Sequence, residues 1–589
     1  MYETNSRHNR KNIGIFIILL VFVLALGGTI KSGAATVKLN YVALGDSLAE
    51  GYAPDGTIGK GYADYLADDI RAAGLLGEFD KRYAVPGFTS QDILAALQDD
   101  KHTDIPGSTD SLGINKRLAQ ADIITLDIGA NDLLDAVKID AQTGTVSYDP
   151  ETVMSLPSQV EANVEEIITQ IKKDSPTAQI YLMGYYNPFL ALPQESQDIL
   201  NLAISQLNTA LNTATSSTGA TFVPTQGAIS ANTQRYLPDS HDIHPNQEGY
   251  RVIAGEFWRV LKTKLNWNSL PGRQFGQQLG NNGVRIGGQD RFDTARLIAE
   301  STYPDHVDAV ILATGNNWPD ALTGSVLSNK YHAPILWVNN TPENSTAAMD
   351  YIQTHVNDTG TVYILGGFSA VGPEFETALM NSGFPAASIT RLSGLDRTST
   401  ALEIDENLAA PTGGTVFMVT DSNYADALTA SAYAATNACP IIPVPKDSLP
   451  VSVLTYLEEE KPSTVIIVGG EGVISQTVEN QMRTLVGTVV RYSGSDRYAT
   501  SSALIASLYP NNPSEVCLAT GEDYPDALAG SAYAGFWGEP IVLLPKSLDQ
   551  PTLDLLHKYQ GVPYTIFGGT GAVSSQNASE VQAELEGNG

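Results

Sequence analysis

The sequence predicts an α/β protein, with a parallel sheet covered by helices in its first half and small repeated α/β modules in its second half. Two observations predict this class. Short apolar segments alternate with segments of helical periodicity along the whole chain, which is typical of parallel sheets. Three short signatures each occur three times in the second half, at nearly constant spacing. The 589 residues are enough for several domains.

The composition indicates a globular protein without a nucleic-acid partner. Hydrophobic residues make up 42% of the chain and charged residues 17%. The net charge is -31, and phosphate binding requires clustered lysine and arginine. Cys439 and Cys517 are too few for a disulfide framework and adjoin apolar segments. We expect two buried free thiols, with a single bridge as the alternative.

Residues 1–35 have the pattern of a signal peptide. Arg7, Arg10 and Lys11 precede an apolar run from Ile13 to about Leu26, and small residues follow. A bilayer crossing needs about 20 apolar residues, so the run is short for a membrane span, although an uncleaved anchor stays open. We expect a secreted protein that starts near Thr36 and has no stable membrane span after cleavage.

Ser47 is the first candidate catalytic residue. The apolar run Tyr41 to Leu44 predicts a buried strand, and Gly45 and Asp46 then turn the chain into a helix. A serine at a strand-to-helix turn lies beside free backbone N–H groups, which suits an acyl-transfer intermediate. An ordinary Gly-Asp-Ser turn is the alternative.

Further elements follow at the spacing of an alternating α/β domain. Helices are predicted over residues 62–76, after Ser90, from a capping box at Ser158, and around residues 199–207 and 253–261. Strands are predicted over residues 121–128, 180–183 and 222–223. In such a sheet ligands bind at the carboxyl ends of the strands.

Gly87 and Asn131 fall at these strand ends, as Ser47 does. Gly87 follows a short apolar run, and a glycine there lets the backbone approach a ligand. Asn131 follows the strand over 121–128, and its amide is able to donate to an oxyanion. A simple turn glycine and a helix cap are the alternatives.

His244 is the best-placed of the eight histidines for proton transfer. It lies in a loop before a helix, is followed by Pro245, and has Asp242 two residues upstream. His241, Asp242 and His244 also form a possible metal cluster, but no further ligand group accompanies them in the sequence.

These four blocks, Gly45-Asp46-Ser47, Gly87, Gly129 to Asp132 and His244-Pro245, resemble the SGNH hydrolases, or GDSL lipase/esterase family. The resemblance covers about residues 38–265 and implies a three-layer α/β/α domain within 36–265. It implies that Ser47 is the nucleophile and His244 the general base. The N–H groups of Ser47 and Gly87 and the Asn131 amide would form the oxyanion hole. No metal or organic cofactor is implied.

The orienting carboxylate departs from the family pattern. The family usually has an aspartate three residues before the histidine, where this chain has His241. We expect Asp242 to orient His244; Asp239, or no carboxylate at all, are the alternatives.

Residues 266–283 are rich in Gly, Asn and Gln and are predicted to be a linker. Beyond them an Arg-rich motif with Gly and Asp recurs, an aromatic residue two positions before Asp-Ala-Leu recurs, and a strand ending in two glycines recurs. The aspartates of the second motif are predicted to be helix N-caps. The arginines of the first motif are expected either to meet an external anion or to brace the modules through those aspartates. The residues concerned are Asp320, Asp426 and Asp526, and Arg285, Arg291, Arg391, Arg397, Arg491 and Arg497.

This half resembles the type 2 cell-wall-binding repeat, over about residues 284–585. The predicted modules are 284–385, 386–487 and 488–589. The resemblance implies packing around a pseudo-threefold axis and non-covalent attachment to an anionic wall polymer of a Gram-positive bacterium. The six arginines would supply the local positive charge, since arginine binds phosphate and carboxylate in a bidentate manner. Such contacts should weaken with salt.

The sequence as a whole predicts a secreted, wall-anchored serine esterase or lipase. Its substrates would be carboxylic esters, either acyl lipids or acylated wall glycans. One alternative is an O-deacetylase of wall glycans. Another is a structural protein of the wall or surface layer whose hydrolase domain is inactive.

Overall fold

The computed structural model describes residues 38–103, 112–139, 145–189, 192–230, 232–239, 242–266, 270–408, 410 and 413–587. The predicted signal peptide, residues 1–35, lies outside these ranges. Among the described residues, no helix combines the length and the apolar character that crossing a membrane requires.

A five-stranded sheet forms the centre of the first half, and each of its strands runs parallel to its neighbours. Its order is β2 (Leu76–Ala84), β1 (Leu39–Gly45), β5 (Ile123–Asp127), β8 (Gln179–Met183) and β9 (Thr221–Val223). All the residues of β5 are buried, as expected for a parallel strand covered on both faces.

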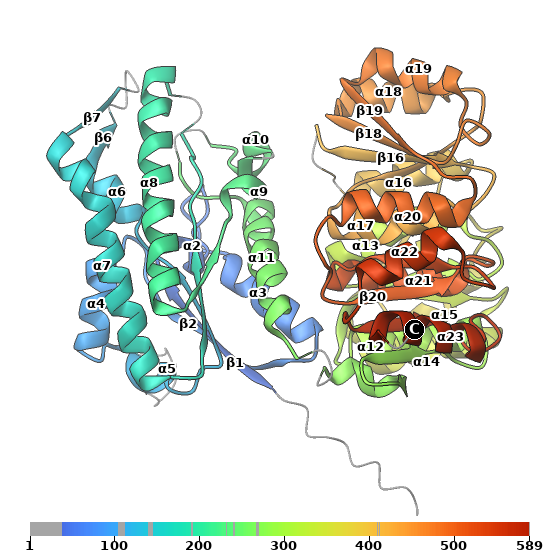
Figure 1. Ribbon diagram of the computed structural model, residues 1–589, viewed down its shortest axis with the longest axis horizontal. Coiled ribbons are helices and arrows are strands. Elements are labelled where there is room, and N and C mark those ends of the chain that lie inside the picture. Colours follow the sequence, from blue (N-terminus) through green and yellow to red (C-terminus); the bar gives the residue numbers. More distant parts are fainter. Residues whose placement is uncertain are drawn as a thin grey trace, which may run out of the picture. The chain divides into compact units, whose positions relative to one another are not determined.

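Helices cover both faces of this sheet (Figure 1). On one face lie α3 (Tyr62–Ala72) and α11 (Gln247–Leu261), and on the other α4 (Ser90–Gln98), α7 (Pro150–Asp174) and α8 (Gln194–Thr218). The Tyr62 and Phe257 rings stack 4.7 Å apart and join α3 to α11. The predicted α/β class with a parallel sheet is therefore confirmed. Shorter helices are α2 (Ser47–Glu50), α5 (Ile114–Leu118), α6 (Ala130–Ala136), α9 (Gln226–Ser230) and α10 (Thr233–Tyr236).

The capping box predicted at Ser158 is wrong, because α7 begins at Pro150 and Ser158 lies inside it. The Asp149 carboxylate accepts a hydrogen bond from the backbone N–H of Thr152 (3.2 Å), and proline is well suited to the first helical position. Asp149 followed by Pro150 is therefore the stronger helix-start signal in this segment, compared with Ser158.

The register of the sheet brings three strand ends to one level. Gly45 of β1 pairs with Ala84 of β2 on one side and with Asp127 of β5 on the other. The residues that follow these strands, including Ser47, Gly87 and Asn131, therefore start from the same edge of the sheet. Gly45 itself has φ 152°, and a Cβ there would lie 1.9 Å from Asp127 Oδ1. Only glycine fits this approach.

The second half contains three further sheets. The first contains β13 (Ile335–Val338), β12 (Val307–Thr314), β14 (Val356–Leu365) and β15 (Ile389–Leu392). The second contains β17 (Ile441–Val444), β16 (Thr415–Thr420), β18 (Thr464–Val468) and β19 (Thr488–Tyr492). The third contains β10 (Gln277–Leu279), β11 (Gly283–Ile286), β22 (Tyr564–Phe567), β20 (Val516–Thr520) and β21 (Ile541–Leu544).

Each sheet takes a strand from the next sequence repeat. Arg391 opens the second repeat but lies on β15, which pairs with β14 of the first. Arg491 lies on β19, which pairs with β18. Arg285 lies on β11, which pairs with β22 near the end of the chain. The strands therefore close a ring from the first repeat to the third.

Part of the segment predicted to be a linker is folded. Residues 267–269 lie outside the described ranges, but Pro271–Phe275 forms a 3₁₀ helix and β10 pairs antiparallel with β11. Arg273 is buried and pairs with the buried Glu515 at 2.5 Å. A buried ion pair and ladder hydrogen bonds order a segment whose composition alone indicates flexibility.

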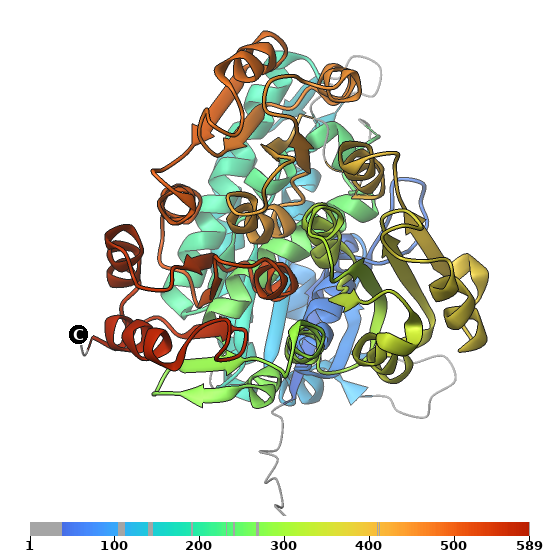
Figure 2. The ribbon, with the colours of Figure 1, turned by 90° about the vertical axis from the view of Figure 1, so that its right-hand side faces the viewer.

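Three central helices hold the modules together. They are α13 (Pro319–Tyr331), α17 (Ala427–Thr436) and α21 (Pro525–Trp537), and each contacts the other two. Figure 2 shows the three α/β modules placed around these helices, as the pseudo-threefold prediction requires. The outer helices are α12 (Arg291–Thr302), α14 (Thr346–His355), α15 (Glu374–Asn381), α16 (Arg397–Leu408), α18 (Val451–Glu460), α19 (Gln476–Leu485), α20 (Arg497–Leu508), α22 (Gln550–Lys558) and α23 (Ser575–Glu586).

The predicted N-caps are wrong in detail. Asp320 and Asp526 are the second residues of their helices, and Asp426 stands at an N-cap position but makes no capping hydrogen bond. These carboxyl groups are largely buried instead. Burial raises the pKa of Asp320, an effect that the Arg397 guanidinium partly offsets. The repeats instead use Asp290 to cap α12, where it accepts from two backbone N–H groups.

The arginines predicted to meet a wall polymer have partners within the protein. Those at the first motif position donate to the carbonyl of the first glycine of each double-glycine turn, at 2.7 to 2.8 Å. These arginines are Arg285, Arg391 and Arg491. Those at the second position lie over an aromatic ring of a neighbouring repeat in the ring of modules, with centroid distances of 5.5 to 5.8 Å. These pairs are Arg291 with Tyr524, Arg397 with Trp318, and Arg497 with Tyr424. The arginines at the second position thus connect neighbouring repeats, whereas those at the first position are bound within one sheet.

Cys439 and Cys517 are both buried and free, as predicted. Burial raises the pKa of the Cys439 thiol to about 12 and that of the Cys517 thiol well above its usual value. Both thiols therefore remain protonated and unreactive at neutral pH.

The ring closure predicts a long-range effect of Ile286→Ala. Ile286 is buried on β11 opposite Phe567, and its truncation should cost about 2–5 kcal/mol. Hydrogen exchange measured by mass spectrometry should accelerate in β22 as well as in β11. Leu202→Ala, at a side chain that is 62% exposed on α8, is the matched control. Faster exchange confined to β10 and β11 would contradict the closure.

Candidate functional site

Ser47 is the first residue of α2, directly after β1. Ser47 is 6% exposed, so only a small part of it reaches solvent. Asp46 is the N-cap, and its Oδ1 accepts a hydrogen bond from the Leu48 N–H at 2.9 Å. This cap fixes the strand-to-helix turn that the sequence predicts.

His244 lies in the loop before α11, and its ring contacts Ser47. Nε2 of His244 lies 2.8 Å from Oγ of Ser47, across 197 residues of sequence. The ring also lies 4.9 Å from that of Tyr52, measured between centroids. A neutral imidazole at hydrogen-bond distance from a serine hydroxyl is positioned to accept its proton.

Asp242 is the carboxylate on the other side of the histidine ring. Its Oδ1 lies 2.5 Å from His244 Nδ1 and accepts the His244 backbone N–H at 2.7 Å. The backbone carbonyl of Asp239 accepts a hydrogen bond from the Asp242 N–H at 3.2 Å. His241, the usual family position, lies outside the described residues. Within the described ranges, no group of three metal-binding side chains is found.

Two backbone N–H groups that follow neighbouring strand ends, those of Ser47 and Gly87, are unpaired in the described part of the chain. Gly87 has φ 83°, and a Cβ at this position would meet nothing within 4 Å, so its backbone faces open space. Nδ2 of Asn131 donates to the Phe88 carbonyl at 2.9 Å and lies 3.3 Å from Asp46 Oδ2. The second of these contacts is longer than an ordinary N–H···O hydrogen bond.

Asp127 is a residue of this site that the sequence interpretation did not single out. It is fully buried at the end of β5, and its Oδ2 accepts from the backbone N–H groups of Asp46 (3.3 Å) and Ala49 (3.1 Å). The signal was present in the sequence, because Asp127 lies between Leu126 and Ile128 in a strand that is apolar apart from Thr125. A buried carboxylate in such a strand requires polar partners.

An apolar pocket opens beside these residues. The empty space inside it is about 520 Å³, part of which is open to solvent. Its lining includes Leu48, Ala130 and Ile243, the immediate neighbours of Ser47, Asn131 and His244. Leucines of α6 and α8, Tyr185, Tyr186 and Phe189 complete most of the wall. An apolar substrate group would therefore lie next to the serine.

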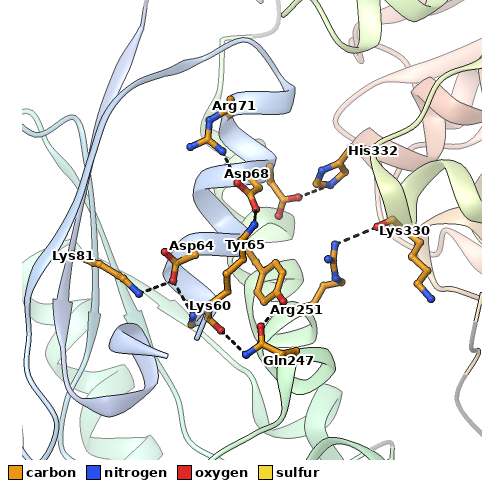
Figure 3. Close-up of polar contacts among 12 residues, drawn as sticks. Lys60, Asp64, Tyr65, Asp68, Arg71, Lys81, Gln247, Arg251, Lys330 and His332 are labelled. Carbon is orange, nitrogen blue, oxygen red and sulfur yellow. Dashed lines mark hydrogen bonds and ion pairs between the residues drawn. The ribbon is translucent and has the colours of Figure 1, made fainter. Parts of the chain in front are cut away.

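Polar contacts of α3 and its neighbours support α2, the short helix that begins at Ser47 (Figure 3). Lys81 pairs with Asp64 at 2.8 Å and also donates to the Glu50 carbonyl, which belongs to α2. The Tyr65 hydroxyl donates to Gln247 at 2.7 Å and so connects α3 with the first residue of α11. Through these contacts α2, α3 and α11 support one another around the Ser47–His244 pair.

Family models match both halves of the chain. Residues 43–252 match the GDSL-like lipase/acylhydrolase family. This range includes every site residue described above. Residues 285–376, 391–479 and 491–578 each match cell wall binding domain 2.

Curated relatives match the chain in part. N-acetylmuramoyl-L-alanine amidase LytC of Bacillus subtilis is 28% identical over 313 residues, which is 52% of this chain and 60% of that protein. The chain thus spans less than two thirds of this relative. The uncharacterized protein YpmR of Bacillus subtilis is 29% identical over 223 residues, 37% of this chain and 80% of that protein.

Solved structures include Cwp8 from Clostridium difficile, which is 24% identical with a TM-score of 0.48 and covers 58% of this chain and 55% of that one. On the family matches and the architecture, the chain combines a domain of the GDSL-like lipase/acylhydrolase family with three repeats of the cell wall binding domain 2 family.

Proposed function

We propose that the protein is a serine ester hydrolase that acts at the cell wall, with Ser47, His244 and Asp242 as its catalytic residues. The observation that carries the proposal is the continuous contact from Ser47 Oγ to His244 Nε2 and from His244 Nδ1 to Asp242. This chain of contacts has the geometry of a nucleophile, a base and a group that orients the base. Membership of the acylhydrolase family supports it.

The reaction follows from these positions. Ser47 Oγ attacks the carbonyl carbon of the ester while its proton passes to His244 Nε2. Asp242 keeps the His244 Nδ1 proton in place and stabilises the cation that forms. The N–H groups of Ser47 and Gly87 and the Asn131 amide receive the negative charge on the carbonyl oxygen. His244 then gives its proton to the departing alkoxide, and an acyl-serine remains.

Water completes the cycle. His244 removes a proton from a water molecule, whose oxygen attacks the acyl-serine carbon. Collapse of the second tetrahedral intermediate returns the proton to Ser47 Oγ and releases the carboxylic acid. Atoms balance as one ester and one water giving one alcohol and one acid.

The apolar pocket favours an acyl chain of several carbons over an acetyl group. Its lining beside the serine is made almost wholly of aliphatic and aromatic side chains. An acetyl group has one methyl to bury, whereas each further buried methylene contributes about 0.8 kcal/mol. Among the alternatives, a lipid or medium-chain acyl ester is therefore preferred to a glycan O-acetyl group.

The three repeats would hold the enzyme at the wall. Their family is described as cell wall binding, which supports attachment to a wall polymer. Three arginines already donate hydrogen bonds to glycine carbonyls inside the modules: Arg285, Arg391 and Arg491. The partly exposed arginines, such as Arg397, therefore remain the better candidates for an anionic polymer.

Catalysis predicts a specific ranking of three variants on p-nitrophenyl butyrate. Ser47→Ala should abolish turnover, and Asp242→Asn should lower kcat by about 10³- to 10⁴-fold, since it removes the charge that orients and stabilises the imidazole. Asp239→Asn is the matched control and should retain near-parental kcat. Steady-state rates of the full chain provide the measurement. Equal rates in the parent and Ser47→Ala would contradict the proposed ester hydrolase activity and favour the alternative of a structural wall protein.

Chain-length preference tests the pocket. The full chain should hydrolyse p-nitrophenyl octanoate with a kcat/KM at least about tenfold above that for the acetate. Leu134→Trp fills the pocket from α6 and should reduce this ratio about tenfold while sparing the acetate rate. Leu202→Trp, at an exposed position of α8, is the control. A preference for acetate in the parent would favour the deacetylase alternative.

Wall attachment predicts co-sedimentation. The full chain should sediment with protein-free Gram-positive cell walls that retain their anionic polymers, and should stay in solution when those polymers have been extracted. Binding should weaken as salt is raised, because exposed charge pairs are screened. Ser47→Ala should sediment like the parent. Equal sedimentation with extracted walls would exclude the polymer as the partner.

A further inference from the structure

Asp127 places a carboxyl group in the protein interior, against the turn that carries Ser47. Besides accepting from the N–H groups of Asp46 and Ala49, it accepts from the Tyr62 hydroxyl at 2.7 Å. Within the part of the chain that the structure describes, it has no ion pair with lysine, arginine or histidine. An isolated charge at such a site is strongly unfavourable.

Asp46 is a second buried carboxyl group beside it. Asp46 is 1% exposed, its Oδ1 accepts from the Leu48 N–H, and its Oδ2 faces the Asn131 amide. Burial raises the pKa of Asp46 to about 6, and burial together with the neighbouring Asp46 raises the pKa of Asp127 well above its usual range. Two carboxyl groups placed like this titrate as a pair, and the first proton bound is shared between them.

We propose that Asp127 is a positioning residue which, in its neutral form, donates its proton to Asp46 and so holds the Ser47 turn and the Asn131 amide in their reactive arrangement. This inference rests on the proposed function for its catalytic meaning. Asp127 itself touches neither Ser47 Oγ nor the site of the substrate; it acts through Asp46 and through the backbone.

The hydrogen bonds around the turn show what the pair accomplishes. Of the four consecutive N–H groups from Asp46 to Ala49, three are bound by the two carboxyl groups. Only the Ser47 N–H stays free, and it is the one that an oxyanion would require. Loss of the shared proton would leave two adjacent negative charges, whose repulsion would pull Asp46 away from Leu48 and Asn131.

The polar network continues behind the pair. Tyr62 also contacts Thr125, whose hydroxyl lies 2.8 Å from that of Tyr41. The titratable groups around the two carboxyls come from β1, α3, α6, the loop after β8, the loop before α11, and α11 itself. They are Tyr41, Tyr62, Asp64, Asp132, Tyr185, Tyr186, Asp242, His244 and Tyr250. Burial raises the pKa of all five tyrosines well above 10, so they stay neutral while the carboxyl pair titrates.

Two substitutions in the full chain separate the neutral carboxyl from a merely space-filling one. Asp127→Asn is neutral at every pH and keeps a donor for Asp46, whereas Asp127→Ala removes donor and acceptors together. The measurement is the pH profile of kcat and KM on p-nitrophenyl butyrate from about pH 5 to about pH 10.

The parent should lose kcat on the alkaline side as the pair loses its shared proton. Asp127→Asn should keep kcat within about threefold of the parent near pH 7 and should lack that alkaline loss. Asp127→Ala should lose kcat about tenfold or more with KM little changed, comparable to the loss of a transition-state donor. An unchanged alkaline limb in Asp127→Asn would overturn the proposal. So would an inactive Asp127→Asn, or parental kcat in Asp127→Ala.

Thermal unfolding gives a readout that does not need catalysis. Because the folded-state pKa of Asp127 is raised, its contribution to stability is present below the unfolded value of about 4 and is lost as pH rises toward the folded value. The difference between the Tm of Asp127→Asn and the Tm of the parent should therefore shift in favour of the variant as pH rises above about 4. A difference independent of pH would show that Asp127 does not carry the proton. If the parent shows no ester turnover, the proposed function fails while this unfolding measurement still decides the protonation state.

Discussion

The parallel register of β1 between β2 and β5 is the constraint on which the site depends. Gly45 pairs with Ala84 and with Asp127, so the loops that carry Ser47, Gly87 and Asn131 leave the sheet at one level. Side chains alternate between the faces of a strand, so a one-residue slip of β5 would turn Asp127 away from the Ser47 turn. Burial of β1 and β5 on both faces makes such a slip costly, and the geometry of the turn follows from the packing of the sheet.

Local signals explain which parts of the site the sequence predicts. Ser47 follows an apolar run and a glycine, and His244 precedes a proline and a helix, so both are predicted from their neighbours and from the family pattern. Asp242 departs from that pattern and is predicted only because it lies in the same loop as His244. The contact between Ser47 and His244 spans 197 residues and rests on that pattern, since no local feature specifies it. Asp127 was missed for a physical reason. Its role depends on Asp46, Ala49 and Tyr62, which only the folded sheet brings together.

The repeats show the same limit on a larger scale. Sequence periodicity identifies three units and their helices, but strand pairing decides that each unit borrows a strand from the next. An arginine beside a glycine-rich turn is suited both to an external anion and to an internal carbonyl. Arg285 is only 5% exposed and donates to the Gly568 carbonyl. Its burial therefore assigns it to the internal carbonyl and not to an external anion. Asp320 likewise lies beyond the cap position, because Pro319 already begins the helix.

The Ser47 turn depends on buried polar groups where apolar packing would give more stability. Burying Asp46 and Asp127 is unfavourable in itself, and hydrogen bonds recover only part of that cost. In return, their carboxyl groups bind rigid backbone N–H groups from a fully enclosed position, where water does not compete. An apolar residue at position 127 would leave the N–H groups of Asp46 and Ala49 unsatisfied, and the turn would then relax to find other acceptors, including the space that the oxyanion needs. Under the proposed function, the polar interior behind the serine and the apolar pocket in front of it would be complementary: the first would fix the donors, and the second would hold the acyl group against them.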